Sequence, residues 1–376
     1  MNLDFTSEQE MLRDAASRFF AKECPFDRVR DIEETEEGYA PDLWKKMAEL
    51  GWQGLIFPEA YGGFEAGFMD LMIIFEEMGK TLFPSPFFST VVQCGLTILE
   101  GGTEAQKKDL LPRIIEGDLI MALARLEQEG SYRAEGIRME ARKDGDRYVL
   151  NGTKLFVADA NISGMLIVAA RPEGSGPTLF LVDSRDPGIE ITKMPTIGKD
   201  NTCEVVLKEV SVPGDSIIGP VGGGFEIIEA VEARGAVLMA AEMVGASKAC
   251  IEMTAAYAKE REQYGIPIGG FQIIQHYMAN MLIRYDVASN YLYQVAWMVD
   301  EGMDFETEAS ALKACANEAF KFISERAVQI HGGIGTSREA DIGLFYRKAK
   351  SYEYICGDTE THYQKVMDNL LARGIS

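Results

Sequence analysis

The feature that most constrains the fold is a change of pattern along the 376 residues. Up to about residue 117, apolar residues recur at helical spacing. Between about 118 and 215 the chain breaks into short β-rich runs, and after 219 it is helical again. Because no long helix separates the β-rich runs, a doubly wound parallel sheet is disfavoured. The order predicts an α+β protein with an N-terminal helical domain (1–117), a middle antiparallel β domain (118–218) and a C-terminal domain like a four-helix bundle (219–376).

Local signals in the first region predict its helices and one loop. Ser7 and Glu10 have the spacing of a capping box at the start of the first helix. Residues 50–63 contain Gly and Pro and are expected to form a loop. Residues 103–115 are expected to form a capped helix that contains Pro112.

The middle and last regions also give explicit expectations. Strands are predicted at 147–150, 166–168, 179–182, 189–191 and 205–207, with turns at 144–146 and at Asn151-Gly152. Gly222-Gly223-Gly224 lacks the spacing of a phosphate-binding loop and is expected to connect a strand to a helix. Long helices are predicted over 226–260, 271–300 and 305–330, the first of them buried on most sides.

Charge and composition narrow the possible partners. The formal net charge of −22 disfavours nucleic-acid binding, because phosphate backbones are anionic. No uncharged run of 18 residues is present, so no membrane span is expected. The N-terminus lacks a basic segment followed by an apolar one, and a cytoplasmic location is predicted.

The metal-ligating residue types are sparse. The six cysteines are scattered without a C-x-x-C pair, which favours reduced thiols over disulfides or a zinc site. With only three histidines, no metal centre is predicted. His276 and His331 are expected to pack or to form hydrogen bonds.

Three segments resemble one known family. Residues 261–272 read R-E-Q-Y-G-I-P-I-G-G-F-Q, residues 329–335 read Q-I-H-G-G-I-G, and Leu50-Gly51 is followed by P-E-A-Y-G-G at 58–63. Together with the order of helical and β regions, these segments make the whole chain similar to the acyl-CoA dehydrogenase family. In that family the first two segments hold FAD, usually from neighbouring subunits. The residue types suit this role, because Arg261 offers a planar donor fork and Gly332 and Gly333 let backbone approach a ligand.

The resemblance implies a set of FAD contacts. Gln329 offers amide donors and acceptors, and Tyr264 and Phe271 are suited to pack on the adenine half. The family's A-L-T-E-P-x-x-G-S-D loop corresponds to residues 122–132, where Ala124 replaces a Thr; in 151–159, Phe156 replaces a common Trp and Ala158 a hydroxyl residue. The full set implied is Arg261, Gln263, Tyr264, Phe271, Gln272, Gln329, Gly332, Gly333, Leu123, Ala124, Gly130, Ser131, Phe156, Ala158 and Asp358.

The resemblance also implies a reaction. Family members oxidise the Cα–Cβ bond of an acyl-CoA thioester: a carboxylate removes the α-proton while hydride passes from Cβ to flavin N5. The thioester oxygen must receive hydrogen bonds as enolate charge develops. The base must be partly desolvated, which raises its pKa toward the working pH.

Both usual positions of the catalytic base lack a carboxylate. Counting from Gln329, one position falls on Cys356; counting from Phe225, the other falls on Gly235. Glu232 lies one turn before Gly235 and Glu242 seven residues after it, so both lie roughly on the same helix face. Asp358, at a family cofactor position, is the third candidate. Glu242 interrupts an apolar run, and a network role and a catalytic role both remain open for it.

These departures resemble a divergent branch of the family found in the degradation of steroids and of alicyclic or aromatic acids. The leading hypothesis is an FAD-dependent acyl-CoA dehydrogenase with a displaced base, acting on a bulky or cyclic acyl-CoA in fatty acid or alicyclic acid degradation and passing electrons to an electron-transferring flavoprotein. Alternatives are a non-catalytic FAD-supporting subunit of a heteromer and an acyl-CoA oxidase. The resemblance implies a homo-oligomer, a dimer or homotetramer, with a heteromer possible.

Overall fold

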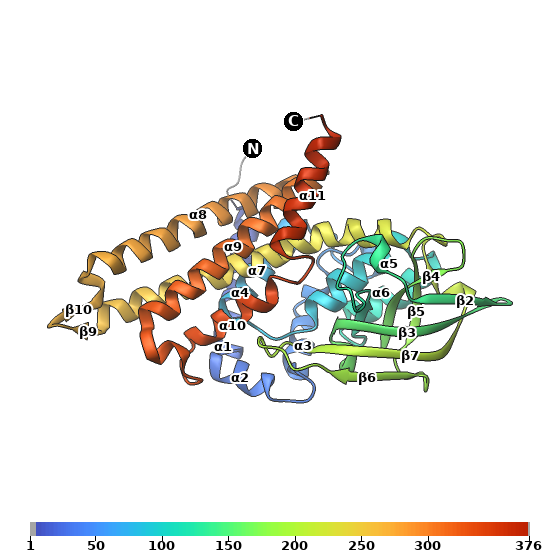
Figure 1. Ribbon diagram of the computed structural model, residues 1–376, viewed down its shortest axis with the longest axis horizontal. Coiled ribbons are helices and arrows are strands. Elements are labelled where there is room, and N and C mark those ends of the chain that lie inside the picture. Colours follow the sequence, from blue (N-terminus) through green and yellow to red (C-terminus); the bar gives the residue numbers. More distant parts are fainter. Residues whose placement is uncertain (1–4, 375–376) are drawn as a thin grey trace. The chain divides into compact units, whose positions relative to one another are not determined.

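The structure, a computed structural model, describes residues 5–374 (Figure 1). These residues fall into two compact units: unit 1 joins 5–30, 67–83 and 236–374, and unit 2 joins Asp31–Ala66 and Pro84–Gly235. This division follows packing rather than chain order. The three-domain division with boundaries at 117 and 218 therefore stays a prediction.

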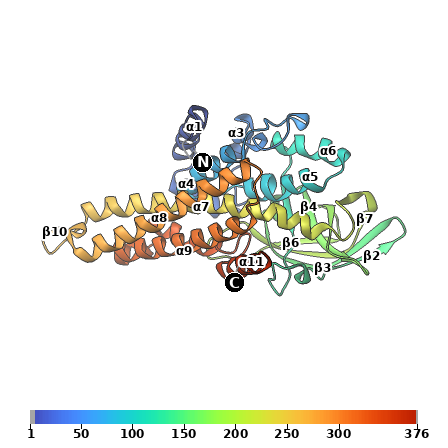
Figure 2. The same cartoon turned by 90° about the horizontal axis from the view of Figure 1, so that it is seen from above.

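Unit 1 is built from helices. Its main elements are α1 (Ser7–Glu23), α4 (Phe68–Thr81), most of α7 (Gly224–Glu260), α8 (Gln272–Asp300), α9 (Glu306–His331), α10 (Ile342–Tyr352) and α11 (Thr359–Ala372). Figure 2 shows α7, α8 and α9 running alongside one another. Between α7 and α8 lies a short hairpin of β9 (Glu262–Gln263) and β10 (Ile266–Pro267). The three long helices predicted from periodicity are confirmed within one or two residues.

The cap of α1 differs from the expectation. Thr6, not Ser7, is the N-cap: its side chain accepts a hydrogen bond from the backbone N–H of Gln9, and the Gln9 side chain accepts one from the backbone N–H of Thr6. The pair Ser7 and Glu10 was therefore wrong by one residue. Both pairs satisfy the capping-box spacing, so spacing alone cannot choose between them.

Helices α4 and α7 meet at two glycines. A Cβ at Gly79 would clash with the backbone carbonyl oxygen of Glu242, and a Cβ at Gly245 would clash with that of Glu76. Each helix thus places a residue without a side chain against the backbone of the other. The central part of α7 is almost entirely buried, as predicted.

Unit 2 combines short helices with a sheet. Its helical elements are α3 (Pro41–Glu49), the π-helical segment η3 (Phe88–Gly95), α5 (Leu96–Gly101) and α6 (Glu104–Ile115), while α2 (Phe26–Glu33) spans the boundary between the units. The helix expected over 103–115 is confirmed: Thr103 caps it and Pro112 lies inside it. The loop expected over 50–63 contains only two short 3-10 turns.

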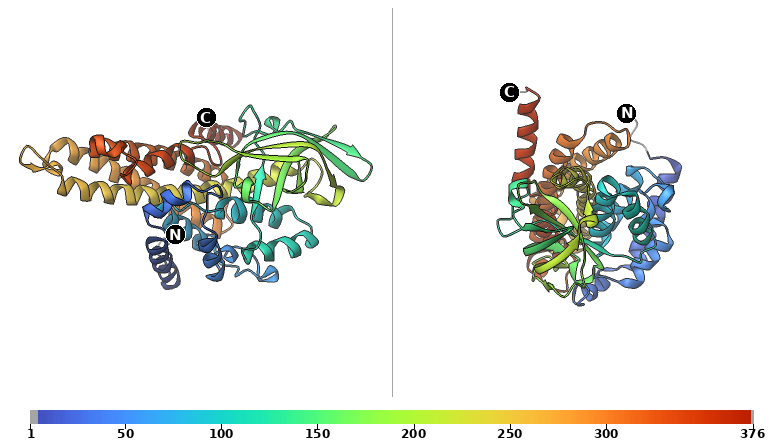
Figure 3. Two further views of the ribbon diagram at one scale, coloured as in Figure 1. Left: turned by 90° about the horizontal axis from the view of Figure 1, so that it is seen from below. Right: turned by 90° about the vertical axis from the view of Figure 1, so that its right-hand side faces the viewer.

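The sheet of unit 2 has eight strands in the described part of the chain. They are β1 (Met121–Ala124), β2 (Glu140–Asp144), β3 (Arg147–Ala158), β4 (Met165–Pro172), β5 (Thr178–Asp183), β6 (Ile189–Lys193), β7 (Thr202–Pro213) and β8 (Ile217–Ile218). The order is β6-β7-β3-β2-β4-β5-β8, with β1 paired to β4. All five predicted strands are present, and Figure 3 shows the long green strands as a twisted sheet.

Two details of the β region differ from the expectation. The pairs β1–β4 and β2–β4 are parallel, so the sheet is only mainly antiparallel. Asn151-Gly152 is not a turn but lies inside β3, where the register with β7 shifts between Leu150 and Gly152. A bulge accommodates this dipeptide, because glycine adopts the required φ of +147° without strain.

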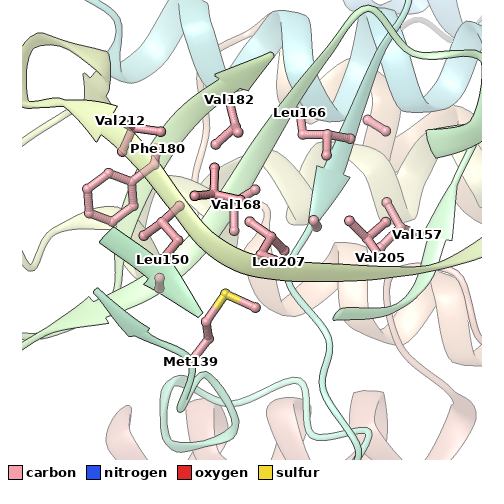
Figure 4. Packing of buried hydrophobic residues seen from close by; sticks show 14 of the residues in the cluster. Met139, Leu150, Val157, Leu166, Val168, Phe180, Val182, Val205, Leu207 and Val212 are labelled. Carbon is pink, nitrogen blue, oxygen red and sulfur yellow. The ribbon is translucent and has the colours of Figure 1, made fainter. Parts of the chain in front are cut away.

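The apolar core of unit 2 is formed by side chains from the strands of this curved sheet. Phe180, Val168, Leu150 and Leu207 point toward one another from four strands (Figure 4). Each is at most 1% exposed, so the strands hold one another through a continuous apolar core. In residues 5–374, no helix combines the length and apolarity that crossing a membrane requires.

Candidate active site and cofactor pocket

One pocket of unit 1 brings together the two segments singled out in the sequence. Its volume is about 350 Å³, near the lower end of the roughly 300–1,000 Å³ typical of ligand pockets. The lining residues are Tyr257, Arg261, Gln263, Ile268, Ile330, His331, Gly332, Gly333 and Ile334. Four predicted cofactor residues, Arg261, Gln263, Gly332 and Gly333, thus lie around one cavity although about seventy residues of chain separate the two pairs.

The ends of two helices form this pocket. Helix α7 stops at Glu260, and the backbone N–H of Arg261 donates to the carbonyl of Tyr257 at 2.9 Å. Helix α9 stops at His331, because Gly332 adopts a φ of +64° that a larger residue rarely takes. A Cβ at Gly332 or Gly333 would meet nothing within 4 Å, so both backbones face open space. The pocket therefore offers bare backbone and a guanidinium to a ligand.

Tyr257 and His331 tie the two helix ends together. Their rings stack at 4.2 Å between centroids and 20° between planes, and the Tyr257 hydroxyl donates to the His331 carbonyl at 3.4 Å. Nδ1 of His331 lies 2.8 Å from the Ala327 carbonyl, and burial lowers the pKa of the imidazole. A neutral ring that donates from Nδ1 leaves Nε2 as an acceptor. The packing and hydrogen-bonding role expected for His331 is confirmed, and its place in the pocket lining is new.

The sequence missed several lining residues. Tyr257, Ile268, Ile330 and Ile334 were not singled out, although Tyr257 lies four residues before Arg261 and so on the same helix face. That spacing was the available signal. Conversely, Tyr264, Phe271, Gln272 and Gln329 do not line the pocket.

Tyr264 and Phe271, the residues predicted to pack on the adenine half of FAD, contact each other. Tyr264 is 95% exposed at the tip of the β9–β10 hairpin, and its ring meets the edge of Phe271 at 6.2 Å. Neither ring lines the pocket. Their contact with FAD stays a prediction.

Unit 2 brings its own two predicted segments side by side. The backbone N–H of Leu155 on β3 donates to the carbonyl of Leu126, just after β1, at 2.9 Å. Leu123 and Ala124 are buried on β1, and Gly130 and Ser131 lie in the loop that follows. The loop of the A-L-T-E-P type and the strand that carries Phe156 are thus neighbours.

Phe156 has the form of a ligand platform. Its side chain is 53% exposed, and its φ of +56° is unusual for an aromatic residue. Such strained backbone collects at functional sites. Ala158, two residues on and also on β3, is half-buried.

Glu232, the first base candidate, is held by a buried cation. One carboxylate oxygen lies 2.6 Å from Nη1 of Arg125, and both side chains are about 5% exposed. The guanidinium also lies 5.0 Å over the ring of Tyr132. Arg125 stands where the family loop has Glu, a substitution that the sequence analysis did not use. A carboxylate that must leave a buried guanidinium to accept a proton is a poor base.

Glu242, the second candidate, accepts a hydrogen bond from a tyrosine. The Tyr352 hydroxyl donates to Oε1 of Glu242 at 2.6 Å, with both residues buried in unit 1. Tyr352 ends α10, four residues before Cys356, while Glu242 follows Gly235 by seven residues on α7. The pair therefore links the chain segments that carry the two vacant base positions.

Asp358, the third candidate, caps a helix. Its Oδ1 accepts from the backbone N–H of Thr361 at 2.9 Å at the start of α11. Burial raises the pKa of this carboxyl, but the hydrogen bonds from Thr361 outweigh it and the pKa is lowered overall. A capping carboxylate with a lowered pKa is poorly suited to remove a proton.

Cys356 lies beside a buried lysine. Cys356 is 4% exposed, and Lys313 on α9 donates through Nζ to the carbonyl of the next residue, Gly357, at 3.3 Å. Lys313 is 43 residues away in the chain, so the neighbours of Cys356 in sequence do not reveal it. Within residues 5–374, no group of three or more His, Cys, Asp or Glu side chains is arranged to hold a metal ion.

Comparison with known proteins identifies the family. Family models described as the N-terminal, middle and C-terminal domains of acyl-CoA dehydrogenase match residues 6–118, 122–210 and 222–371. The chain belongs to the acyl-CoA dehydrogenase family. It is 32% identical to a probable acyl-CoA dehydrogenase, YngJ, of Bacillus subtilis strain 168, over 99% of this chain and 100% of that protein.

Two further relatives bear on the chemistry. An acryloyl-CoA reductase (NADH) of Anaerotignum propionicum is 30% identical over 99% of this chain and 97% of its own length. The crystal structure of an acyl-CoA dehydrogenase complexed with FAD from Bacillus anthracis has a TM-score of 0.92 and 26% identity, and the match covers 99% of this chain and 68% of that one.

The family member described here is an FAD flavoprotein, and its residues fit the cofactor. The pocket of unit 1 supplies a permanently charged donor fork from Arg261, amide groups from Gln263 and bare backbone at Gly332 and Gly333, which suits a diphosphate. The exposed ring of Phe156 in unit 2 suits a flat aromatic system. Which of these residues contact FAD stays a prediction.

Proposed function

We propose that this chain oxidises a bulky or cyclic acyl-CoA to the corresponding enoyl-CoA and that Glu242 is its base. The observation that carries the proposal is the buried Glu242–Tyr352 hydrogen bond of 2.6 Å, located between segments whose usual carboxylates are replaced by Gly235 and Cys356. Electrons then pass to an electron-transferring flavoprotein. The family assignment supports the reaction class, whereas the substrate and the electron acceptor are part of the proposal.

The chemistry requires a base, hydrogen bonds and exclusion of water. FAD, when bound, supplies the hydride acceptor. Glu242 takes the α-proton, and burial keeps its carboxylate away from bulk water. The Tyr352 hydroxyl fixes the orientation of the carboxylate through Oε1. Of the two other candidates, Glu232 is paired with the Arg125 guanidinium, and Asp358 caps the N-terminus of α11.

The small residues at the usual base positions support a bulky acyl group. A glutamate at 235 or at 356 would occupy volume that Gly235 and Cys356 leave to the substrate. Space gained in this way accommodates a ring or a branched chain. The proposal therefore predicts a preference for cyclic over straight-chain acyl-CoA substrates.

A second candidate function is the reverse reaction. The Anaerotignum propionicum relative carries the name acryloyl-CoA reductase, which supports reduction of an enoyl-CoA by a chain of this kind. In that direction the protonated Glu242 carboxyl would deliver the α-proton. Because base and acid would be the same group, the proposed role of Glu242 applies to either direction.

An anaerobic titration tests the proposed function. The purified holoenzyme is mixed with straight-chain, branched and cyclic acyl-CoA thioesters while the oxidised flavin band is followed. Bleaching by cyclic substrates supports the proposal, and reoxidation of dithionite-reduced protein by an enoyl-CoA supports the reductive direction. Persistence of the band with every acyl-CoA would refute the dehydrogenase and favour a non-catalytic subunit of a heteromer. Rapid reoxidation by air would favour an oxidase.

Assembly and location are also proposals. Ile273, Leu282, Ile283 and Val287 on α8 are each about half exposed or more, and such an apolar face supports a homo-oligomer, for which we propose a homotetramer. Sedimentation of the purified chain alone measures its self-association, and sedimentation with an electron-transferring flavoprotein measures binding of that partner. The cytoplasmic location stays a prediction.

A further inference from the structure

Lys313 is a fully buried cation that binds backbone carbonyls. It lies on α9 with 0% of its surface exposed. Its Nζ donates to Oδ1 of Asn317 at 2.7 Å and to the carbonyls of Tyr352, Glu353 and Gly357 at 3.1, 3.2 and 3.3 Å. A buried ammonium is costly unless hydrogen bonds and opposite charges compensate it, so this arrangement needs a reason.

The three carbonyls belong to one short segment. Tyr352 and Glu353 end α10, where the last carbonyls of a helix have no partner within the helix and carry partial negative charge. Gly357 lies in the turn that leads to α11. One ammonium thus joins the end of α10 to the turn around Cys356.

The turn itself adopts an unfavourable backbone conformation. Cys356 has a φ of +62° and Gly357 a φ of +117°. A non-glycine residue in the left-handed region costs free energy unless the surroundings hold it there. A Cβ at Gly357 would lie 3.1 Å from Nε2 of the buried His362. Lys313 and His362 therefore both lie against the turn.

We propose that Lys313 is a positioning residue of the active site: it holds the turn of residues 352–358 so that position 356 and the Tyr352 hydroxyl keep their places. The catalytic part of this inference rests on the function proposed above. The same lysine that binds the Tyr352 carbonyl supports the side chain that hydrogen-bonds Glu242. Loss of the ammonium charge would therefore loosen the turn and disturb the orientation of Glu242.

The charge of Lys313 changes near neutral pH. Burial lowers its pKa to about 8, against the opposing effect of the Cys356, Glu353 and Asp358 groups that face it. His362 on α11 also faces it, and burial together with this lysine lowers the pKa of His362 to about 3, so the imidazole stays neutral. Lys313 is therefore charged below about pH 8, and the hold on the turn weakens as the pH rises above that value.

Hydrogen exchange tests the inference without relying on activity. Amide protection of residues 352–358 is measured by mass spectrometry in wild type, Lys313→Met and Lys313→Arg, with the α9 amides as internal reference. In Lys313→Met we expect protection of the segment to fall by about tenfold or more, because hydrogen bonds to a charged group are lost. Lys350→Met is the matched control: Lys350 lies on α10 but pairs at the surface with Glu325, so little change is expected.

The pH profile supplies a second readout, and its first part needs only the wild-type protein. In wild type, protection of 352–358 beyond the intrinsic pH dependence of exchange, and kcat/KM, should both decline above about pH 8. In Lys313→Arg the decline should move up by about one pH unit or more, because a guanidinium stays charged. Equal protection of the segment in wild type and Lys313→Met, or a decline that Lys313→Arg leaves in place, would overturn the inference. If Lys313→Met loses protection of 352–358 but no acyl-CoA bleaches the wild-type flavin, the hold of Lys313 on the turn is upheld and the proposed function is refuted.

Discussion

Two buried glutamates on α7, ten residues apart, form different contacts. Glu232 lies 2.6 Å from the Arg125 guanidinium, and Glu242 accepts a hydrogen bond of 2.6 Å from the Tyr352 hydroxyl. A guanidinium pairs with the first carboxylate, whereas a phenol orients the second. The difference teaches that depth of burial alone does not distinguish two carboxylates on one helix, and that their partners must be compared.

The largest expected effect is on catalysis. Glu242→Gln keeps the size of the side chain and a hydrogen-bonding oxygen for Tyr352 but removes the proposed base. We expect the rate of flavin bleaching by substrate to fall by about 10²–10⁴-fold, the usual contribution of general base catalysis. Stopped-flow absorbance under anaerobic conditions measures it.

A rescue sharpens the same experiment. In the Glu242→Gln background, Cys356→Glu returns a carboxylate to a family base position and should recover part of the rate for small substrates. Unchanged bleaching in Glu242→Gln would show that the base lies elsewhere.

The next effect is on stability. Glu232→Gln leaves the Arg125 guanidinium buried without its anion, and we expect a loss of about 3–5 kcal/mol in the free energy of unfolding. Urea denaturation followed by circular dichroism measures it. The double variant Arg125→Met with Glu232→Leu should recover most of the loss, since apolar side chains of similar volume replace a buried ion pair well. If Glu232→Gln were as stable as wild type, the contrast between the two glutamates would be removed.

A smaller effect is expected at the phenol. Tyr352→Phe removes only the hydroxyl that donates to Glu242, and we expect a loss of roughly 1.5–3 kcal/mol in stability, the range for hydrogen bonds to charged groups. The bleaching rate should fall less than in Glu242→Gln, because the base is retained in a less fixed orientation. Tyr363→Phe, whose hydroxyl bonds Glu318 at the surface, serves as control.

The smallest expected effect is on the pH dependence of stability, and it comes from a third buried carboxyl. Asp159 in unit 2 accepts from Ser89 Oγ at 2.6 Å and from Asn201 Nδ2 at 3.1 Å, and burial raises its pKa from 3.8 to about 6. Because the folded value lies above the unfolded one, the stability that the protonated form contributes is complete below about pH 4 and is lost as the pH rises through 6.

The variant Asp159→Asn stays uncharged over this range. Its stability should therefore depend less on pH between 4 and 6 than that of wild type and should exceed it above pH 6. Thermal unfolding at a series of pH values measures the difference. Parallel pH profiles for the two proteins would contradict a raised pKa at Asp159.

The sequence predicted the helices and strands well because their signals are local. Periodicity located α7, α8 and α9 within two residues, since apolar spacing directly reflects which face is buried. The prediction failed where one local signal fits two structures. Thr6 and Ser7 both fit an N-cap, and Asn151-Gly152 fits both a turn and a bulge. Tertiary packing decides such cases.

The same reasoning predicted only some residues of the candidate site. Arg261 and Gly332 lie in recognisable motifs, and the structure brings them to one pocket. Arg125, Lys313 and Tyr352 were missed because their partners lie far along the chain; the Tyr352–Glu242 bond, for example, joins residues 110 positions apart. A side chain selected for a distant partner leaves no pattern among its neighbours in sequence.

The contact between α4 and α7 has a consequence for how this enzyme can evolve. Gly79 touches the main chain at Glu242, and Gly245 touches it at Glu76, so neither helix can slide along or rotate against the other. Inserting one residue into α7 before Gly245 would turn the preceding part of the helix by about 100° and point its carboxylates elsewhere. An insertion or deletion in α7 before Gly245 would therefore have to be compensated within the same turn of helix for both glycine contacts to be kept.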